Sequence, residues 1–474
     1  MRETKLYNAL VQLSGHELNR LHRFVLSPYF NQNESITRLF EWIKNDLKSD
    51  NNIELSKENL WKHVLKISDD YDDRRFRKLQ SDLLRLVEEY YAQESFEANP
   101  IHKAKYLLDA VFERSLLELQ NGTIRTANRL VEDQTLKPAS FYYYKYEIEQ
   151  STFILNRSLI ERSTKSNIEN IAENLDRFYL AEKLRYYCTI LNHKHLANLN
   201  YNMLFIDQII EHVESNDYSD TPPIVIYYQI LLSYKEPEER KHYENIKLLI
   251  EKHIHLFPET EVAEILDSAL NYCIKRMNSG ESEFVREIFE LYQNWLKRGL
   301  LHVRGKIDPF HFKNIVTAGL RLREFDWIEH FINNFNVFLE QRFQANATTY
   351  SLAQLYFYKK DYSNVIRLLS KVEYNDMSYN LDSKTLLMAS YYELDEIEAL
   401  GSFLDTFRVY LGRNKELPTF RRKHYLSTIS IVRKLSKIVP GDKKEIEKLQ
   451  KEIDGTQGVV SKNWILEKLA LLNK

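Results

Sequence analysis

The densest group of side chains that could bind a ligand is a basic cluster near the amino terminus. Guanidinium and ammonium groups pair with phosphate oxygens, so such a cluster on one helix can contact the backbone of DNA or RNA. The cluster consists of Arg74, Arg75, Arg77 and Lys78, with Lys62, His63, Lys66 and Arg85 nearby. The acidic run at 69–73 just before it favours the other interpretation, the solvated face of an amphipathic helix. Both interpretations stay open from the sequence.

A run of aromatic residues at 141–146 is the second candidate for binding. Tyrosine rings can stack on nucleic-acid bases or anchor a bound peptide, which makes Tyr142, Tyr143 and Tyr146 candidate partner-binding residues. Tyr142 and Tyr146 are four residues apart and share one face of a helix. That spacing favours packing between neighbouring helices over an exposed platform.

Cysteine and histidine spacing does not indicate a metal site. Cys188 and Cys273 are too far apart to form a Cys-x-x-Cys clip, and their apolar, aromatic neighbours predict buried free thiols. Two histidine pairs are spaced i, i+2, which puts their rings about 200° apart on a helix. These pairs are His193/His195 and His253/His255. A calcium loop starting at Asp70 would need glycine where Arg75 stands. We therefore expect no metal and no other cofactor.

Motifs of catalysis are also missing from the sequence. The segment Gly455-Thr456-Gln457-Gly458 lacks the Lys-Ser/Thr pair of a phosphate-binding loop and does not follow a predicted strand. No G-x-S-x-G elbow presents a serine nucleophile, and neither cysteine has the electropositive setting of a thiolate. We expect a protein without enzymatic activity.

Composition indicates long helices joined by short connections. Only 11 glycines and 10 prolines occur in 474 residues, too few for the many turns of a sheet-rich fold. The formal net charge of -2 gives no overall attraction to nucleic acid. The first residues lack a signal-peptide pattern, and no window resembles a membrane span, so we expect a cytoplasmic protein with no membrane partner.

Three regions follow from the positions of the apolar stripes and the helix breakers. Residues 1–98 form an N-terminal helical unit, 99–307 a tyrosine-rich helical region, and 308–474 a region of helical hairpins with capping helices. The prolines fall between apolar stripes, and Asn121-Gly122 is expected to separate two helices. Absence of Gly/Ser-rich or Pro-rich linkers favours one continuously packed body.

Apolar positions in the last third of the chain recur at an offset of 35 residues. The first hairpin contributes Ala353, Tyr356, Tyr362, Val365, Leu369 and Val372, and the second contributes Met388, Tyr391, Ile397, Leu400, Leu404 and Phe407. Ala318 and Trp327 extend the pattern to a third, degenerate hairpin, in which Arg321 replaces the aromatic residue of the other two. A fixed period of this length is typical of α-helical repeats, whose hairpins bury their faces by stacking.

The segment 312–411 resembles the tetratricopeptide (TPR) repeat in its residue types and spacing. The residues that carry the resemblance are Leu352, Ala353, Tyr356, Tyr362, Val365, Leu369 and Val372. The layout of the chain, with Ser-Pro-Tyr-Phe-Asn at 27–31 and these hairpins near the end, is also similar to uncharacterised bacterial helical-repeat proteins. The TPR resemblance implies a scaffold whose concave surface holds a peptide or another protein.

The sequence thus predicts an all-α fold, an elongated right-handed α-solenoid of roughly 22–25 helices with a small N-terminal helical unit. The expected function is that of a non-enzymatic cytoplasmic scaffold or adaptor for a protein or peptide partner. The alternative is a nucleic-acid-associated regulator that contacts DNA or RNA through the Arg74–Lys78 face. The two differ in salt dependence, because phosphate contacts weaken steeply with salt.

Overall fold

The computed structural model describes residues 2–48, 59–62, 71–156, 166–197, 201–370, 377–414 and 417–473. Within these residues the regular structure is helical, and the only extended pairing is an isolated bridge between Val303 and Lys306. The all-α prediction is confirmed. The chain divides into two compact units, Met1–Lys183 and Leu184–Lys474.

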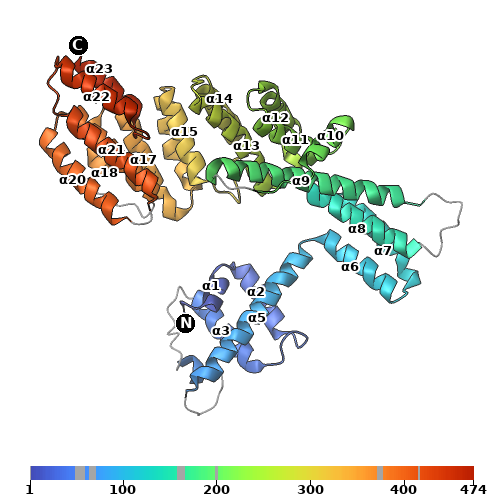
Figure 1. The fold of residues 1–474 in the computed structure, drawn as a ribbon. Helices are drawn as coiled ribbons and strands as arrows, with labels where there is room; N and C mark the ends of the chain where they lie inside the picture. Colours follow the sequence, from blue (N-terminus) through green and yellow to red (C-terminus); the bar gives the residue numbers. More distant parts are fainter. Residues whose placement is uncertain are drawn as a thin grey trace. The chain divides into compact units, whose positions relative to one another are not determined.

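The first unit begins with helices packed around one apolar core (Figure 1). These helices are α1 (Lys5–Val11), α2 (Gly15–Leu26), α3 (Glu34–Lys48) and α5 (Asp73–Glu97). Phe76, Leu83 and Val87 recur at helical spacing, which predicts a buried stripe, and all three are buried where α5 meets α1, α2 and α3. The sequence also predicts a helix that starts at Ser56 and carries Val64 and Ile67, and these three residues lie outside the described part of the chain.

Three further helices of the first unit pack in sequence, and a fourth continues into the second unit. They are α6 (Pro100–Glu113), α7 (Leu117–Glu132), α8 (Ala139–Asn156) and α9 (Ile168–Ala197). Asn121 and Gly122 were expected to separate two helices, and this prediction is wrong, because both lie inside α7. The break falls earlier, at Arg114–Leu116, where Ser115 adopts a positive φ. Burial of Gln120, Thr123 and Ala127 outweighs the weak helix propensity of Asn-Gly.

Local sequence signals explain where many helices begin. Ser14 and Glu17 form a reciprocal capping box at the start of α2, and the Asp72 carboxylate accepts two backbone N–H groups at the start of α5. Pro100, Pro222 and Pro309 occupy first turns, where the missing N–H costs no hydrogen bond. As predicted, the prolines of the described helices stand at their starts or between them.

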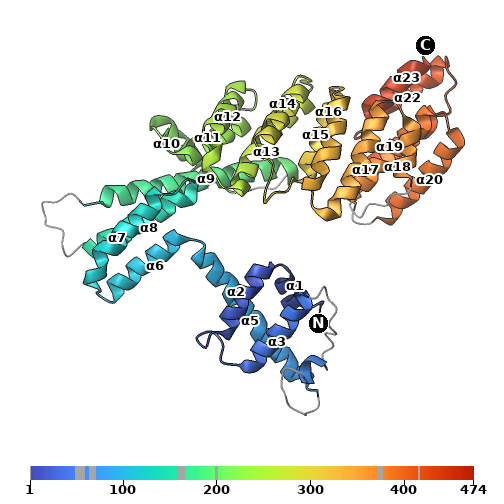
Figure 2. The same ribbon diagram turned by 180° about the vertical axis from the view of Figure 1, so that it is seen from behind.

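The second unit consists of helices that pack mainly on their neighbours in sequence (Figures 1 and 2). After α9 come α10 (Ile206–Ser215), α11 (Pro222–Lys235), α12 (Arg240–His253), η1 (Ile254–Leu256), α13 (Glu259–Asn278), α14 (Phe284–Lys297), α15 (Pro309–Arg321), α16 (Phe325–Phe335), η2 (Asn336–Phe338), α17 (Gln341–Tyr358), α18 (Tyr362–Leu369), α19 (Met377–Glu393), α20 (Ile397–Arg413), α21 (Thr419–Leu435), α22 (Lys443–Gly455) and α23 (Lys462–Leu472). Besides these neighbours, α15 contacts α17 and α17 contacts α19. This order of contacts is compatible with a helical repeat.

The repeat offset of 35 residues corresponds to buried positions in successive hairpins. Ala353 and Met388 are fully buried, as are Val365 and Leu400. Tyr356, Tyr362 and Tyr391 are half-buried, and Ile397 is 39% exposed, so the offset does not mark full burial at every position. Val372 lies outside the described residues. The predicted region boundaries at 98/99 and 307/308 coincide with helix junctions, and as domain boundaries they stay predictions.

Close contact between α15 and α16 depends on a residue without a side chain. A Cβ at Gly319 would lie 2.6 Å from Ile328 Cγ1 and 2.9 Å from a ring carbon of Phe289. Both distances are too short for carbon atoms, so only glycine lets the two helices approach this closely. This contact sets the position of α15, on which the site described below is built.

The second half of α9 is anchored to α11 and α13 by a polar cluster. Arg185 donates to both carboxylate oxygens of Glu264 at 2.9–3.0 Å. Beside it, the Tyr227 hydroxyl donates to Glu261 at 2.9 Å, and both of these side chains are buried. Burial alone would lower the pKa of Arg185, but the carboxylates of Glu264 and Glu261 raise it above its ordinary value.

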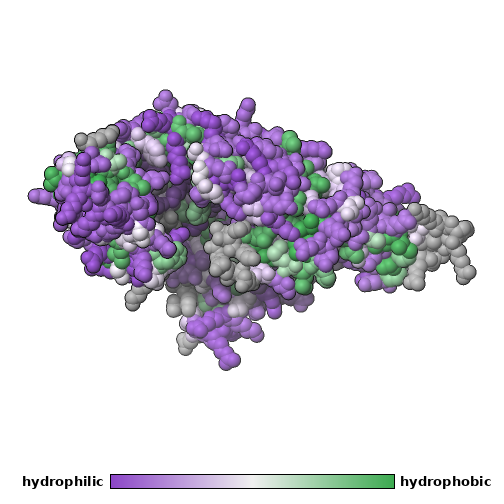
Figure 3. Space-filling model, turned by 45° about the horizontal axis from the view of Figure 1, so that its top comes forward, coloured by the Kyte–Doolittle hydropathy of each residue, from purple (hydrophilic) through white to green (hydrophobic). Residues whose placement is uncertain are grey.

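Hydrophilic residues dominate the face of the molecule drawn in Figure 3, with apolar patches between them. None of the described helices combines the length and the apolar character that crossing a bilayer requires.

Candidate functional site

The basic cluster lies at the start of α5, with its side chains exposed. Arg74, Arg75, Arg77 and Lys78 are all solvent-exposed. Arg77 pairs with Asp73 at 2.5 Å, one turn earlier, and the Arg75 guanidinium lies 5.8 Å from the ring centre of Trp61. Lys62 is exposed as well, whereas His63 and Lys66 lie outside the described residues.

Neighbouring charges weaken this cluster as a phosphate-binding surface. Asp73 neutralises one of the four cations, and Asp72 sits at the helix start, where its carboxylate binds the backbone of Arg74 and Arg75. Acidic residues also outnumber basic ones over 1–98. The arrangement has the exposure that phosphate contact needs but little excess positive charge.

The tyrosines of the aromatic run are engaged within the first unit. Tyr142 is buried, and the guanidinium of Arg177 lies 6.0 Å from its ring centre. The ring of Tyr143 packs 5.0 Å from Phe178 of α9, and its hydroxyl donates to Glu147. Tyr146 is partly buried, and its hydroxyl accepts a hydrogen bond from the amide of Gln150. The helix-packing interpretation accounts for these contacts.

The two cysteines are buried free thiols, as the sequence predicts. Burial raises the pKa of Cys188 well above its ordinary value and that of Cys273 to about 12, so both stay protonated at neutral pH. Among the described residues, no group of histidine, cysteine and carboxylate side chains is arranged to hold a metal ion.

The structure reveals a different candidate site on the second unit, which the sequence did not suggest. The helices α13, α15, α17 and α19 are the first helices of four successive hairpins, and we call the surface that they share the first-helix face. On α15, Phe310, Asn314, Thr317 and Arg321 recur at i, i+4, i+7 and i+11, so they point the same way. None of the four is buried. A cavity lies at each end of this row.

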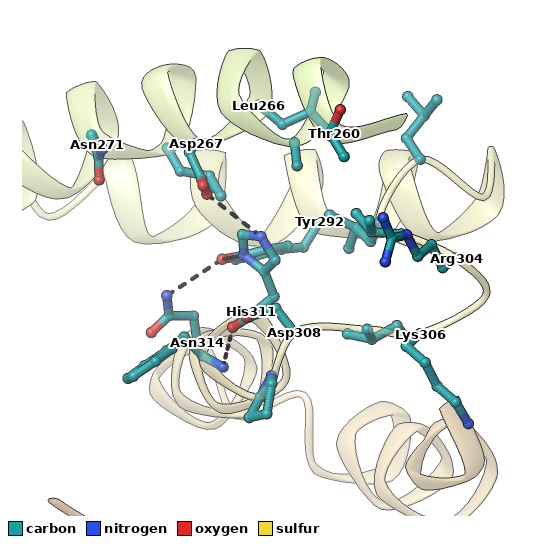
Figure 4. Close-up of a pocket in the computed structure, with 18 of the residues that line it drawn as sticks. Thr260, Leu266, Asp267, Asn271, Tyr292, Arg304, Lys306, Asp308, His311 and Asn314 are labelled. Carbon is teal, nitrogen blue, oxygen red and sulfur yellow. Dashed lines mark hydrogen bonds and ion pairs between the residues drawn. The ribbon is translucent and has the colours of Figure 1, made fainter. Parts of the chain in front are cut away.

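The α13–α15 cavity, at the first end, has a volume of about 640 Å³ and is lined by α13, the start of α15 and the loop between α14 and α15 (Figure 4). Its polar wall is a chain of hydrogen bonds. Asn314 donates to the hydroxyl of Tyr292 at 3.4 Å, and that hydroxyl lies 3.2 Å from His311 Nδ1. His311 Nε2 lies 3.5 Å from Asp267. With its proton on Nε2, His311 accepts a hydrogen bond from Tyr292 at Nδ1 and turns its N–H side toward Asp267.

This chain of polar contacts holds the polar wall of the cavity in place. Both ring nitrogens of His311 are engaged, one by Tyr292 and one by Asp267, which fixes the orientation of the imidazole. Burial raises the pKa of Tyr292, which keeps its phenol protonated at neutral pH. Burial also raises the pKa of Asp267, while a positive charge on His311 would lower it. Arg304 and Lys306 stand on the opposite wall (Figure 4).

The α17–α19 cavity, at the other end, has a volume of about 670 Å³. It is lined by Arg321 at the end of α15, by α17, by α19 and by the C-terminal segment 460–464. Nearby, Lys313 of α15 reaches across to form an ion pair with Asp382 of α19. Its ammonium group lies 5.7 Å from the ring centre of Tyr350 of α17, so three first helices meet here.

One irregularity of the repeat in the sequence coincides with this site. Tyr356 and Tyr391 hold the same repeat position in two hairpins, and Arg321 replaces them in the preceding one. That substitution makes the repeat irregular, and the structure shows that Arg321 lines the α17–α19 cavity. His311, Asn314 and Gln354 carry no comparable signal, because polar residues are common on helix surfaces.

The fold and these cavities define an all-α protein of sequentially packed helices, compatible with a helical repeat. No protein family, no curated protein and no solved structure matches the chain. The function of the chain is therefore inferred from its own structure.

Proposed function

We propose that this protein is a non-enzymatic cytoplasmic scaffold whose first-helix face binds a segment of a protein partner. The hairpins α15–α16, α17–α18 and α19–α20 would be TPR-like and would continue as a right-handed solenoid. One observation carries the proposal: two cavities of several hundred Å³ open at the two ends of the exposed row Phe310, Asn314, Thr317 and Arg321.

The chemistry of the face supports peptide binding. Its cavities combine apolar walls with a few fixed polar groups, the composition that binds side chains and main chain together. The Tyr292–His311–Asp267 chain and the Lys313–Asp382 pair hold these polar groups in place before any partner arrives. Such preorganisation lowers the entropy cost of binding.

Site-specific photo-crosslinking in the cells that make the protein tests the proposal. We expect a benzophenone side chain at Thr317 to crosslink one discrete protein and to map to a single segment of it. His330, exposed on the second helix α16, is the matched control position and should give no such product. Equal crosslinking from both positions, or none from Thr317, would count against binding on the first-helix face.

A nucleic-acid-associated role is the second candidate, because all four basic side chains at the start of α5 are exposed. We expect the charge reversal Arg74→Glu, Arg75→Glu, Arg77→Glu to leave recovery of the protein partner unchanged. If these side chains contact phosphates, three such contacts should make the native chain bind nucleic acid roughly 40-fold more weakly at 200 mM than at 50 mM salt. The variant should lack this dependence of affinity on salt. Nuclease-sensitive material that copurifies with the native chain and is lost in this variant would favour the second candidate.

A further inference from the structure

The α17–α19 cavity is closed on one side by the chain's own C-terminal segment 460–464. The backbone N–H of Val460 donates to Thr428 at 2.8 Å, and Trp464 Nε1 donates to Glu393 at 2.7 Å. Lys468 pairs with the same carboxylate at 2.7 Å. These contacts tie the segment to α19 and α21, so it forms a fixed wall of the cavity.

Positive charge predominates in this cavity. Arg321 is exposed, its guanidinium donates to the sulfur of Met277 at 3.3 Å, and no carboxylate in the described part of the chain lies within 4 Å of it. The ammonium group of Lys462 lies 3.6 Å from the carboxylate of Asp454, a long distance for an ion pair. The one carboxylate that lines the cavity, Asp382, already neutralises Lys313. An anionic group would therefore be attracted to Arg321.

An acceptor without a donor lies on another wall of the cavity. The side chain of Gln354 lines the cavity from α17, and its Oε1 is buried with no hydrogen-bond partner. A buried amide oxygen left unsatisfied is destabilising, so a rotation of the Gln354 amide that turns this oxygen toward an N–H donor in the cavity would be favourable. Apolar residues surround these polar groups, among them Phe357, Leu386, Met388 and Trp464.

We propose that the α17–α19 cavity binds an acidic segment of a protein partner. A side-chain carboxylate of the segment pairs with Arg321, one of its main-chain N–H groups donates to Gln354 Oε1, and a neighbouring apolar side chain contacts Trp464. Unpaired positive charge, an unsatisfied acceptor and an apolar wall together match this chemistry. The inference rests on the proposed function, since it names the partner chemistry of the same face.

Selection from a random heptapeptide library displayed on phage, with the full chain as the target, tests this inference. We expect the selected peptides to be enriched in Asp and Glu beside an apolar residue. The variant Arg321→Glu should lose that enrichment and bind the selected acidic peptides at least about 100-fold more weakly. The matched control is Arg367→Glu, an exposed charge reversal on the second helix α18, which should select the same peptides as the native chain.

The outcomes separate the inference from the proposed function. If the selected peptides bind Arg321→Glu as tightly as the native chain but fail to bind Thr317→Trp, the inference of an acidic segment is overturned. Binding of a partner on the first-helix face is then still supported. Peptides that bind Thr317→Trp normally but fail to bind Arg321→Glu would retain the acidic ligand of the α17–α19 cavity and overturn a segment that spans the first-helix face. Peptides that bind both variants normally would overturn both proposals. Equal melting temperatures of the native chain and the variants show that the comparison concerns binding.

The hydrogen bond to Gln354 has a separate test. Gln354→Leu keeps a side chain of similar size and removes the unsatisfied oxygen, so the free protein should melt at the same or a higher temperature. Affinity for a selected acidic peptide should fall about tenfold. Unchanged affinity would overturn this contact.

Discussion

Arg185→Met is expected to lower the free energy of unfolding of the second unit by about 1–2 kcal/mol. Arg185 holds Glu264 through its guanidinium fork and lies beside the buried Glu261. Methionine keeps much of the apolar stem but removes the positive charge, so a buried carboxylate loses a compensating cation. The value lies below the range for a broken buried pair, because the side chains of Arg185 and Glu264 are 25% and 50% exposed and solvent screens their ion pair.

Denaturant unfolding, followed by circular dichroism, measures this effect. Arg367→Met is the matched control, since Arg367 is exposed and should change stability by less than about 0.5 kcal/mol. Tyr227→Phe should cost about 1–3 kcal/mol, because it removes the hydroxyl that donates to Glu261. If Arg185→Met unfolds like its control, the polar cluster does not anchor α9.

Thr317→Trp is expected to weaken binding of the crosslinked partner at least about 100-fold. Thr317 is half-buried and lies in the middle of the row Phe310, Asn314, Thr317 and Arg321 on α15, between the two cavities. An indole there would occupy the path between the cavities and exclude a bound segment. Its hydroxyl bonds only to the Lys313 carbonyl of its own helix, so its loss should leave the fold intact.

Titration of the purified partner segment by fluorescence anisotropy measures the effect of Thr317→Trp. His330→Trp adds the same side chain on α16 and should bind like the native chain. Both variants should show the helical circular dichroism and the melting temperature of the native chain. Native-like affinity in Thr317→Trp would mean that the partner binds elsewhere.

Residue patterns that depend on local burial could be interpreted correctly from the sequence. Helical spacing in α5 identified Phe76, Leu83 and Val87 as core residues, and the offset of 35 identified Ala353 with Met388 and Val365 with Leu400. A helix that packs on any neighbour buries one face, and the residues of that face recur every three to four positions. The spacing of apolar residues therefore predicts which residues are buried, whichever helix they contact. The same logic fails for Asn121-Gly122, where burial of the flanking face overrides local propensity.

The sequence by itself determined the helical class, the burial of Ala353, Val365, Met388 and Leu400 in the last third of the chain, and the burial of both cysteines. Only the tertiary structure decided that Arg321 faces a cavity, that His311 meets Asp267 and Tyr292, and that residues 460–464 return to α17 and α19. These contacts join residues far apart in the chain. They depend on how helices are stacked and how close they approach, as at Gly319, and helical periodicity carries no information about either.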